Sequence, residues 1–450
     1  MCECRTYALI LFFLEVLMEI QNKINKPDRT VLVGIVTQKE TQEMLDKSMD
    51  ELERLLQTAG GECVARLTQS KESPDVRTVI GSGKAAELAY LCACNDVTLV
   101  VFDCEMSPSQ IRNLENILGD EVRVIDRSML ILDIFALHAV TGEGKLQVEL
   151  AQLKYTAPRL MGRGAEMSRL GGGIGTRGPG ESKLETDRRH LQRRVHALEA
   201  QIAEMDKNRK TMRASRDKSG IPEVAIVGYT NAGKSTLLNR LTDAGILAED
   251  KLFATLDPTT RKFYLPCGEP VLLTDTVGFI NKLPHHLVRA FRSTLEEACN
   301  ADILMIIVDA SDENFKDQLK VTEDLLCELG ASDKPTLYVF NKCDMGMAET
   351  PVVGREAADN VAFISALTGQ GVDRMVSLLE GMVLSDKRRV TYLIPNSEAG
   401  ALNTLYKNAT VENVEYGAEG MTVTVLADAR VRGMMRKYAL DDPEPREDWE

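Results

Sequence analysis

The residues best suited to chemistry begin at Gly228, where a short apolar run ends in the spacing Gly-x4-Gly-Lys-Ser. The run 224–227 predicts a buried strand and residues 236–241 predict a helix, so the glycines lie in a strand-to-helix turn. In such a turn backbone N–H groups surround phosphates, the lysine reaches the terminal phosphates, and the hydroxyl binds Mg²⁺. The predicted phosphate-binding residues are Gly228, Tyr229, Thr230, Asn231, Ala232, Gly233, Lys234, Ser235 and Thr236.

A second polar cluster follows the apolar run 271–273. It consists of Asp275, Thr276, Val277 and Gly278. An acidic residue that ends such a strand can hold Mg²⁺ through a water molecule, and the glycine N–H can contact the γ-phosphate. We therefore predict that this Asp-x-x-Gly motif is the second nucleotide-responsive segment, switch II.

A third cluster predicts which base is bound. Asp344 follows the strand-like run 336–340, and its carboxylate can accept hydrogen bonds from the N1–H and 2-amino groups of guanine. Adenine lacks that pair of donors, so the wrong base would leave buried polar groups unpaired. The predicted guanine-binding residues are Asn341, Lys342, Cys343 and Asp344, with Ser365, Ala366 and Leu367 supporting the base from the other side.

Between the phosphate loop and Asp275 lies the predicted switch I segment, which consists of Phe253, Ala254, Thr255, Leu256 and Asp257. A threonine from this region should supply a second hydroxyl to Mg²⁺, beside Ser235. We favour Thr255, and Thr259 and Thr260 remain alternatives.

The order of strands and helices predicts an α/β protein with several domains, since 450 residues allow about three at roughly 150 residues each. A P-loop GTPase domain with a parallel sheet should be preceded by a small α/β domain and a helical hairpin, and followed by a small α+β domain. The predicted segments are a leader (1–28), the α/β domain (29–142), the hairpin (143–220), the GTPase domain (221–385), the α+β domain (386–440) and an acidic tail (441–450). Gly81–Lys84 (GSGK) lacks the full phosphate-loop spacing, so we favour a tight turn into a helix there over a second nucleotide site.

The helical hairpin is predicted to contact RNA. Helical patterns over 144–160 and 184–212, the second with a heptad seam, flank a glycine-rich loop. From Lys154 to Lys218 there are sixteen Lys and Arg against eight Asp and Glu, a balance of about +8 in a chain whose formal net charge is −14. A basic, glycine-rich loop is suited to phosphate-backbone contact, although a solvated charged helix face has the same composition. The predicted RNA-contact residues are Arg163, Arg169, Arg177 and Lys183.

Composition favours a cytoplasmic protein. Apolar residues make up 44% of the chain, and the ten cysteines include no Cys-x-x-Cys pair, which favours reduced thiols. The apolar run 8–18 is shorter than the roughly 20 residues of a membrane span, so we expect no span. We expect a monomer.

These motifs, together with the stretch GGGIGTRGPGESKLETDRR (171–189), resemble the HflX family of ribosome-associated P-loop GTPases, of the translation-factor-related, Era/Obg-like class. The resemblance implies GTP hydrolysis to GDP with Mg²⁺, binding to the large ribosomal subunit and its RNA, and splitting or rescue of stalled ribosomes. It also raises ATP use by the N-terminal domain, which would give Gly81–Lys84 a role. Alternatives are a GTP-dependent RNA-modification or ribosome-assembly factor, and a non-catalytic, nucleotide-switched adaptor.

One position departs from many small GTPases. Phe279 follows Gly278, where those proteins carry the glutamine that orients the attacking water. A phenyl ring cannot form that hydrogen bond, so catalysis requires another group. Asn231 resembles the asparagine that holds K⁺ in cation-dependent GTPases, and a group supplied by the ribosome is the other candidate.

Overall fold

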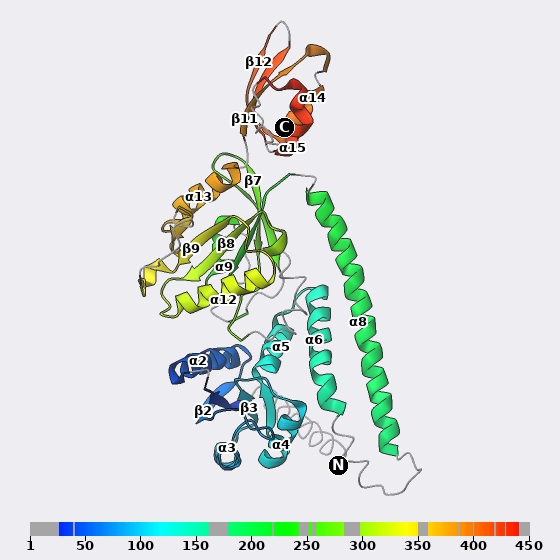
Figure 1. Cartoon of the computed structure of the whole chain (residues 1–450), viewed down its shortest axis with the longest axis vertical. Helices are drawn as coiled ribbons and strands as arrows, with labels where there is room; N and C mark the ends of the chain where they lie inside the picture. Colours follow the sequence, from blue (N-terminus) through cyan, green and yellow to red (C-terminus); the bar gives the residue numbers. More distant parts are fainter. Residues whose placement is uncertain are drawn as a thin grey trace, which may run out of the picture. The chain divides into compact units, whose positions relative to one another are not determined.

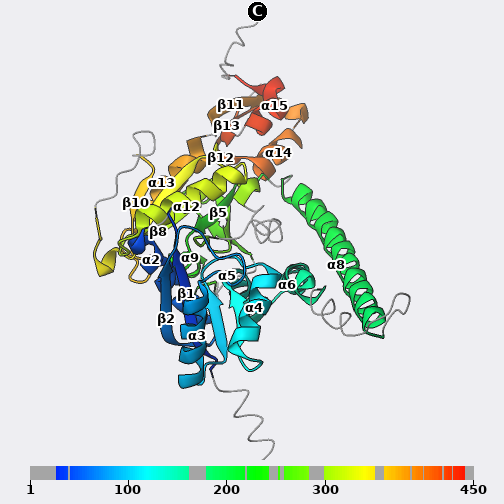
Figure 2. The same ribbon diagram turned by 60° about the horizontal axis from the view of Figure 1, so that its bottom comes forward.

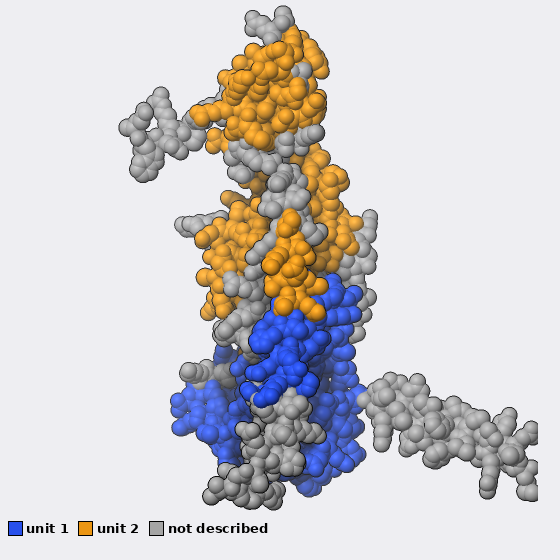
Figure 3. All heavy atoms as spheres, turned by 90° about the vertical axis from the view of Figure 1, so that its right-hand side faces the viewer, with its two compact units in different colours: residues 1–199 blue, residues 200–450 orange. Residues whose placement is uncertain are grey.

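The computed structural model describes residues 27–38, 41–161, 179–217, 220–242, 252–253, 258–282, 298–349, 359–385, 388–398, 400–417, 420–427 and 429–440. The chain divides into two compact units, residues 1–199 and 200–450, which Figure 3 shows in different colours. The predicted leader and acidic tail lie almost entirely outside the described residues.

The first unit contains a parallel sheet of four strands in the order β2-β1-β3-β4. Apolar side chains of β1 and β3 fill its centre, and helices that alternate with the strands supply the rest of its core. The elements are β1 (Arg29–Val36), α2 (Gln42–Thr58), β2 (Glu62–Ser70), α3 (Ser82–Cys94), β3 (Leu99–Phe102), α4 (Pro108–Leu118), β4 (Arg123–Asp126) and α5 (Arg127–His138).

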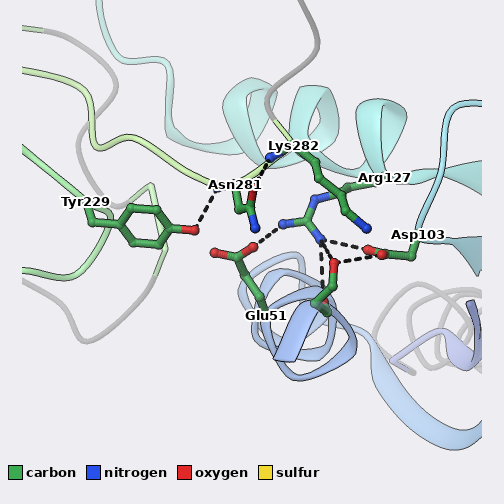
Figure 4. A network of polar contacts seen from close by, with 7 residues as sticks. Glu51, Asp103, Arg127, Tyr229, Asn281 and Lys282 are labelled. Atoms are coloured by element: carbon green, nitrogen blue, oxygen red, sulfur yellow. Dashed lines mark hydrogen bonds and ion pairs between the residues drawn. The ribbon is translucent and has the colours of Figure 1, made fainter. Parts of the chain in front are cut away.

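A buried ion cluster joins three of these elements (Figure 4). Arg127 at the start of α5 donates to Asp103 Oδ1 (2.7 Å), just beyond the end of β3, and is paired with Glu51 of α2. Ser48 donates to the other carboxylate oxygen of Asp103 (2.7 Å). Because a buried charge is costly unless it is paired, removing one partner of this cluster would leave an uncompensated charge between α2 and α5.

Two long helices follow, α6 (Gly142–Met161) and α8 (Pro179–Asp217). Figures 1 and 2 both show α6 beside the first part of α8. Ion pairs of Glu149 with Arg194 (2.7 Å) and of Lys154 with Glu199 (2.8 Å) link them. Leu198, on the predicted heptad seam, is fully buried. At 1.5 Å per residue, the 39 residues of α8 span about 58 Å.

The second unit contains a six-stranded sheet in the order β10-β9-β8-β5-β7-β6. Five strands are parallel, and β6 is antiparallel to β7 because a short turn closed by Leu265 and Glu269 joins them. Alternate residues of the strands face two separate cores, one shared with α9 and α13 and the other with α12. Figure 1 labels these three helices around the sheet. The elements are β5 (Glu223–Gly228), α9 (Lys234–Thr242), β6 (Thr259–Tyr264), β7 (Pro270–Asp275), β8 (Ile303–Asp309), α12 (Phe315–Glu328), β9 (Thr336–Asn341), the 3-10 turn η1 (Cys343–Met345), β10 (Val361–Phe363) and α13 (Val372–Ser385).

A three-stranded antiparallel sheet in the order β11-β13-β12 follows in the same unit. One face of this sheet is buried against two helices in a core that includes Tyr392, Val423 and Leu405. The elements are β11 (Arg388–Ile394), the 3-10 turn η3 (Asn396–Glu398), α14 (Gly400–Asn408), β12 (Thr410–Tyr416), β13 (Met421–Ala427), α15 (Ala429–Met435) and the 3-10 turn η4 (Arg436–Tyr438).

The fold is therefore mixed α/β with a parallel-rich sheet, as predicted. The parallel sheet predicted for the GTPase domain carries one antiparallel edge strand, β6. Gly81 is the N-cap of α3, so Gly81–Lys84 forms the start of a helix. None of the helices in the described part of the chain has a long enough apolar stretch to cross a membrane.

Candidate functional site

The phosphate loop lies at the carboxyl end of β5, between that strand and α9. Two of its glycines cannot be replaced without strain. A Cβ on Gly228 (φ 148°) would lie 2.2 Å from the Ile307 carbonyl oxygen, and one on Gly233 (φ 94°) would lie 2.2 Å from Asn341 Nδ2. The loop is thus held against two neighbouring strands by contacts that only glycine permits.

Lys234 places a positive charge inside this loop. Its ammonium is buried and donates to the carbonyl oxygens of Gly228 (3.1 Å) and Tyr229 (2.7 Å). Burial lowers its pKa to about 8, and the nearby Asp275 carboxylate acts in the opposite direction. An anion bound in the loop would favour the charged form, as a phosphate does.

Ser235 and Asp275 form the part of the site that suits a metal ion. The Ser235 hydroxyl donates to Asp275 Oδ2 (2.6 Å) at the end of β7. Burial raises the pKa of Asp275, against the opposing effects of Lys234 and Ser235. Its Oδ1 is buried and has no hydrogen-bond partner among the described residues. A hydroxyl and a carboxylate with one oxygen unpaired are ligands of the type that Mg²⁺ prefers, so the residues fit this ion.

The third predicted Mg²⁺ ligand, Thr255, lies outside the described residues. Of the alternatives, Thr260 shares a hydrogen bond with Thr274 (2.9 Å) across the β6–β7 pair. Thr259 is opposite Asp275 in the same pair.

The predicted guanine-binding segments come together beside the phosphate loop. Asn341 is buried at the end of β9 and donates to the Ala232 carbonyl (2.8 Å) while accepting from Ala366 N–H (2.8 Å). One side chain therefore ties the phosphate loop to the Ser365–Leu367 segment. Lys342 adopts a positive φ of 63° and pairs with Asp309 (2.7 Å). Asp344 is exposed in the 3-10 turn that follows, where its carboxylate is accessible to a base.

Two residues that contact this region, Arg240 and Asp309, were not predicted from the sequence. Arg240, in the last turn of α9, donates to the Leu367 carbonyl (2.9 Å) and so holds the 365–367 segment. Nothing in its local pattern distinguishes it from a solvated arginine. Asp309 ends the apolar strand β8, a signal of the kind that identified Asp275.

Backbone hydrogen bonds connect the segment after Gly278 to the phosphate loop. Thr230 N–H donates to the Phe279 carbonyl (2.8 Å), and Phe279 N–H donates to the Gly228 carbonyl (3.0 Å). The Tyr229 hydroxyl accepts from Asn281 N–H (2.7 Å; Figure 4). A shift of this segment would therefore break bonds to the predicted phosphate loop.

Of the predicted switch I and RNA-contact residues, only Phe253 and Lys183 lie in the described part of the chain. Phe253 of switch I is buried, with a φ of 57°. The remainder of switch I and three residues of the RNA-contact loop lie outside the described residues, namely Ala254, Thr255, Leu256, Asp257, Arg163, Arg169 and Arg177. Lys183 lies in α8, and its side chain is not among those described.

A phosphate loop at the carboxyl edge of a parallel-rich sheet, with an Asp-x-x-Gly strand end and an Asn-Lys-x-Asp strand end beside it, defines the class of P-loop GTPases. Family models agree with this class. Residues 223–342 match the model described as 50S ribosome-binding GTPase, residues 46–136 match GTP-binding GTPase N-terminal, and residues 138–216 match GTP-binding GTPase Middle Region.

Curated relatives identify the family. The GTPase HflX of Lacrimispora saccharolytica is 49% identical over 397 residues, covering 88% of this chain and 92% of that protein. The GTPase HflX of Escherichia coli is 41% identical over 387 residues, covering 86% and 90%. Among solved structures, a GDP complex of a GTP-binding protein from Sulfolobus solfataricus is 23% identical, covers 79% of this chain and 99% of that chain, and has a TM-score of 0.42. The chain belongs to the HflX family and is a GTP-hydrolysing enzyme, as the sequence resemblance implied.

Proposed function

We propose that this GTPase binds the large ribosomal subunit and couples GTP hydrolysis to the splitting or rescue of stalled ribosomes in the cytoplasm. The observation that carries the proposal is the net basic segment 154–218, within a chain that is otherwise strongly acidic. Such a segment is suited to contact with the phosphates of an RNA backbone. The description of the matching family model, 50S ribosome-binding GTPase, supports the same partner.

Helix α8 would present this charge to RNA. Arg193 and Lys207 are both exposed and lie 14 residues apart, at equivalent heptad positions on the same side of the helix. At 1.5 Å per residue, their Cα atoms are about 21 Å apart along the axis, so they can contact different phosphates. The loop residues Arg163, Arg169 and Arg177, with Lys183, would extend the contact.

The nucleotide site would respond to GTP as follows. Lys234 binds the terminal phosphates, while Ser235, Asp275 and a switch I threonine, Thr255 in our proposal, hold Mg²⁺. Mg²⁺, when bound, neutralises charge on the phosphates. Asp344 and the Ser365–Leu367 segment select guanine, and Asn231 is the candidate ligand for K⁺. Because switch II is bonded to the phosphate loop through Phe279, we expect loss of the γ-phosphate to shift the switch II backbone.

Co-sedimentation through sucrose gradients with a non-hydrolysable GTP analogue tests the proposal. We expect the protein to migrate with large ribosomal subunits. Combining Arg193→Glu with Lys207→Glu should weaken this association on the order of tenfold, because phosphate contacts add nearly independently.

A matched control combines Lys320→Glu with Arg374→Glu, two exposed positions on α12 and α13. It makes the same change in net charge away from α8, and we expect near-normal binding. Equal losses for both pairs would contradict a role for α8. Migration with tRNA-sized species alone would favour an RNA-modification GTPase, and negligible GTP turnover under every condition would favour an adaptor.

A further inference from the structure

We propose that the hydroxyl of Thr230 is a catalytic hydrogen-bonding group in GTP hydrolysis and supplies part of what a glutamine supplies in many small GTPases. The proposal rests on the GTPase activity of the family and is independent of ribosome binding. Three observations carry it: an unpartnered buried hydroxyl, its position beside the phosphate-binding groups, and the orientation of Phe279.

The first observation is the environment of the hydroxyl. Thr230 is 6% exposed, and its Oγ1 is buried without a hydrogen-bond partner among the described residues. Buried hydroxyls are nearly always hydrogen-bonded, because leaving one unpaired costs free energy. Asp275 Oδ1, in the same site, is unpartnered in the same way. Both oxygens belong to the site that receives the phosphates and their metal ion, so both are suited to partners that arrive with GTP.

The second observation is position. A Cβ built on Gly278 would lie 2.8 Å from both Cα and Cγ2 of Thr230 and 2.9 Å from the ammonium of Lys234. The Thr230 side chain, Gly278 and Lys234 therefore converge on one place. In a P-loop GTPase the lysine contacts the terminal phosphates and the glycine N–H lies at the γ-phosphate. The methyl group of Thr230 faces Gly278, and its hydroxyl, which is carried by the same Cβ, therefore lies beside the region where the reacting phosphoryl group must sit.

The third observation concerns position 279, where many small GTPases carry the glutamine that orients the attacking water. Phe279 is 1% exposed and packs in the core with Val227 and Ile306, so its side chain points away from the phosphates. Its carbonyl nevertheless accepts the Thr230 N–H (2.8 Å). The backbone of position 279 therefore fixes Thr230, and the Thr230 side chain supplies the polar group that position 279 lacks.

The reaction that Thr230 would assist is ordinary GTP hydrolysis. The oxygen of a water molecule forms a bond to the γ-phosphorus, the bond to the β–γ bridging oxygen breaks, and GDP leaves with that electron pair. The proton of the water ends on the released inorganic phosphate. The hydroxyl accepts a hydrogen bond from the water and donates one to a γ-phosphoryl oxygen, and it neither gains nor loses a proton. Such a contact lowers the barrier because it is strongest in the transition state.

Two substitutions distinguish the contribution of the Thr230 hydroxyl to hydrolysis from that of its methyl group. Thr230→Val keeps the shape and the contact with Gly278 but removes the hydroxyl, whereas Thr230→Ser keeps the hydroxyl and removes the methyl. Single-turnover GTP hydrolysis by the full chain, without ribosomes, should fall by about 30- to 100-fold in Thr230→Val and stay within about threefold of wild type in Thr230→Ser. The dissociation constants of GTP and GDP should change by less than about threefold in both variants.

A transition-state analogue gives a readout that a purely structural role would not move. In Thr230→Val the affinity for GDP with aluminium fluoride should fall by about the same factor as the rate, while GDP affinity is unchanged. The nucleotide-free variant should melt at the wild-type temperature or higher, because it loses a buried hydroxyl that has no partner. Wild-type hydrolysis by Thr230→Val would overturn the proposal, as would a loss in Thr230→Ser as large as that in Thr230→Val. Because these assays contain no ribosomes, neither result contradicts the ribosome-binding proposal, which is tested separately by co-sedimentation.

Discussion

At Phe279 the backbone and the side chain make different kinds of contact. Its N–H and carbonyl are both bonded to the phosphate loop, while its ring is buried among Val227, Ile306 and Ala298. The ring stabilises the core below the predicted switch II, and the peptide groups link this segment to the predicted phosphate loop. A polar side chain at this position would have to leave the core before it could reach the phosphates.

Replacing Phe279 by glutamine should therefore fail to restore a small-GTPase mechanism. We expect Phe279→Gln to lower the free energy of unfolding by about 3–4 kcal/mol, because it removes a buried ring and buries an amide. GTP turnover should not rise. Chemical denaturation of the full chain, followed at the transition that GDP shifts upward, measures the loss, and Phe279→Leu should cost less than half as much. Faster turnover in Phe279→Gln would contradict this account of position 279.

Much of the site could be predicted at the residue scale because each motif is a short run with fixed spacing. The glycines, Lys234, Ser235, Asp275 and Asn341 all follow from that pattern, although their binding roles remain predictions. The unpartnered Thr230 hydroxyl and the lowered pKa of Lys234 could not be predicted, since both depend on burial produced by segments far apart in the sequence.

Helix α9 connects the predicted phosphate loop to the segment 365–367, which is predicted to support guanine. It begins at Lys234, inside the phosphate loop, and near its end Arg240 donates to the Leu367 carbonyl. Asn341 makes a second connection, from Ala232 to Ala366. The segment predicted to support guanine is therefore positioned by two elements rather than by its own sequence.

Arg240 should consequently affect how long the nucleotide stays bound. We expect Arg240→Met, which keeps the apolar stem and removes the donor, to speed GDP release about fivefold, corresponding to roughly 1 kcal/mol for one exposed charge-assisted hydrogen bond. Stopped-flow release of a fluorescent GDP analogue measures this rate. The control Arg374→Met removes an arginine from an exposed position on α13 and should release GDP at the wild-type rate. Unchanged release in Arg240→Met would show that Asn341 alone is sufficient.

At the element scale the sequence predicted the alternation of strands and helices better than their directions. Apolar runs located β5, β7 and β9, because buried parallel strands are continuous in hydrophobicity. The antiparallel direction of β6 follows from the turn at Leu265–Glu269 and was not expected. The cluster of Arg127, Asp103 and Glu51 was also missed, because its members are separated by 24 to 76 residues.

On the scale of the whole chain, nucleotide chemistry and excess positive charge belong to different segments. The predicted phosphate- and guanine-binding residues lie between 228 and 367, whereas the basic segment covers 154–218. Each of the three sheets has its own core, so a change in one does not require the others to unfold. The fold class and the family could be predicted because the GTPase motifs and the glycine-rich stretch occur in one chain. Ribosome binding remains a proposal, because a net positive charge favours polyanions without specifying an RNA or a ribosome.

GTP turnover measured with and without purified large ribosomal subunits, in K⁺ and then in Na⁺, tests the central claim most directly. The account predicts slow intrinsic turnover that rises at least about tenfold when large subunits are added, because Phe279 cannot orient water and Thr230 supplies only part of what a glutamine would supply. A rate in K⁺ that exceeds the rate in Na⁺ would support Asn231 as a cation ligand. Full-rate hydrolysis by the isolated protein, unchanged by large subunits, would contradict the account.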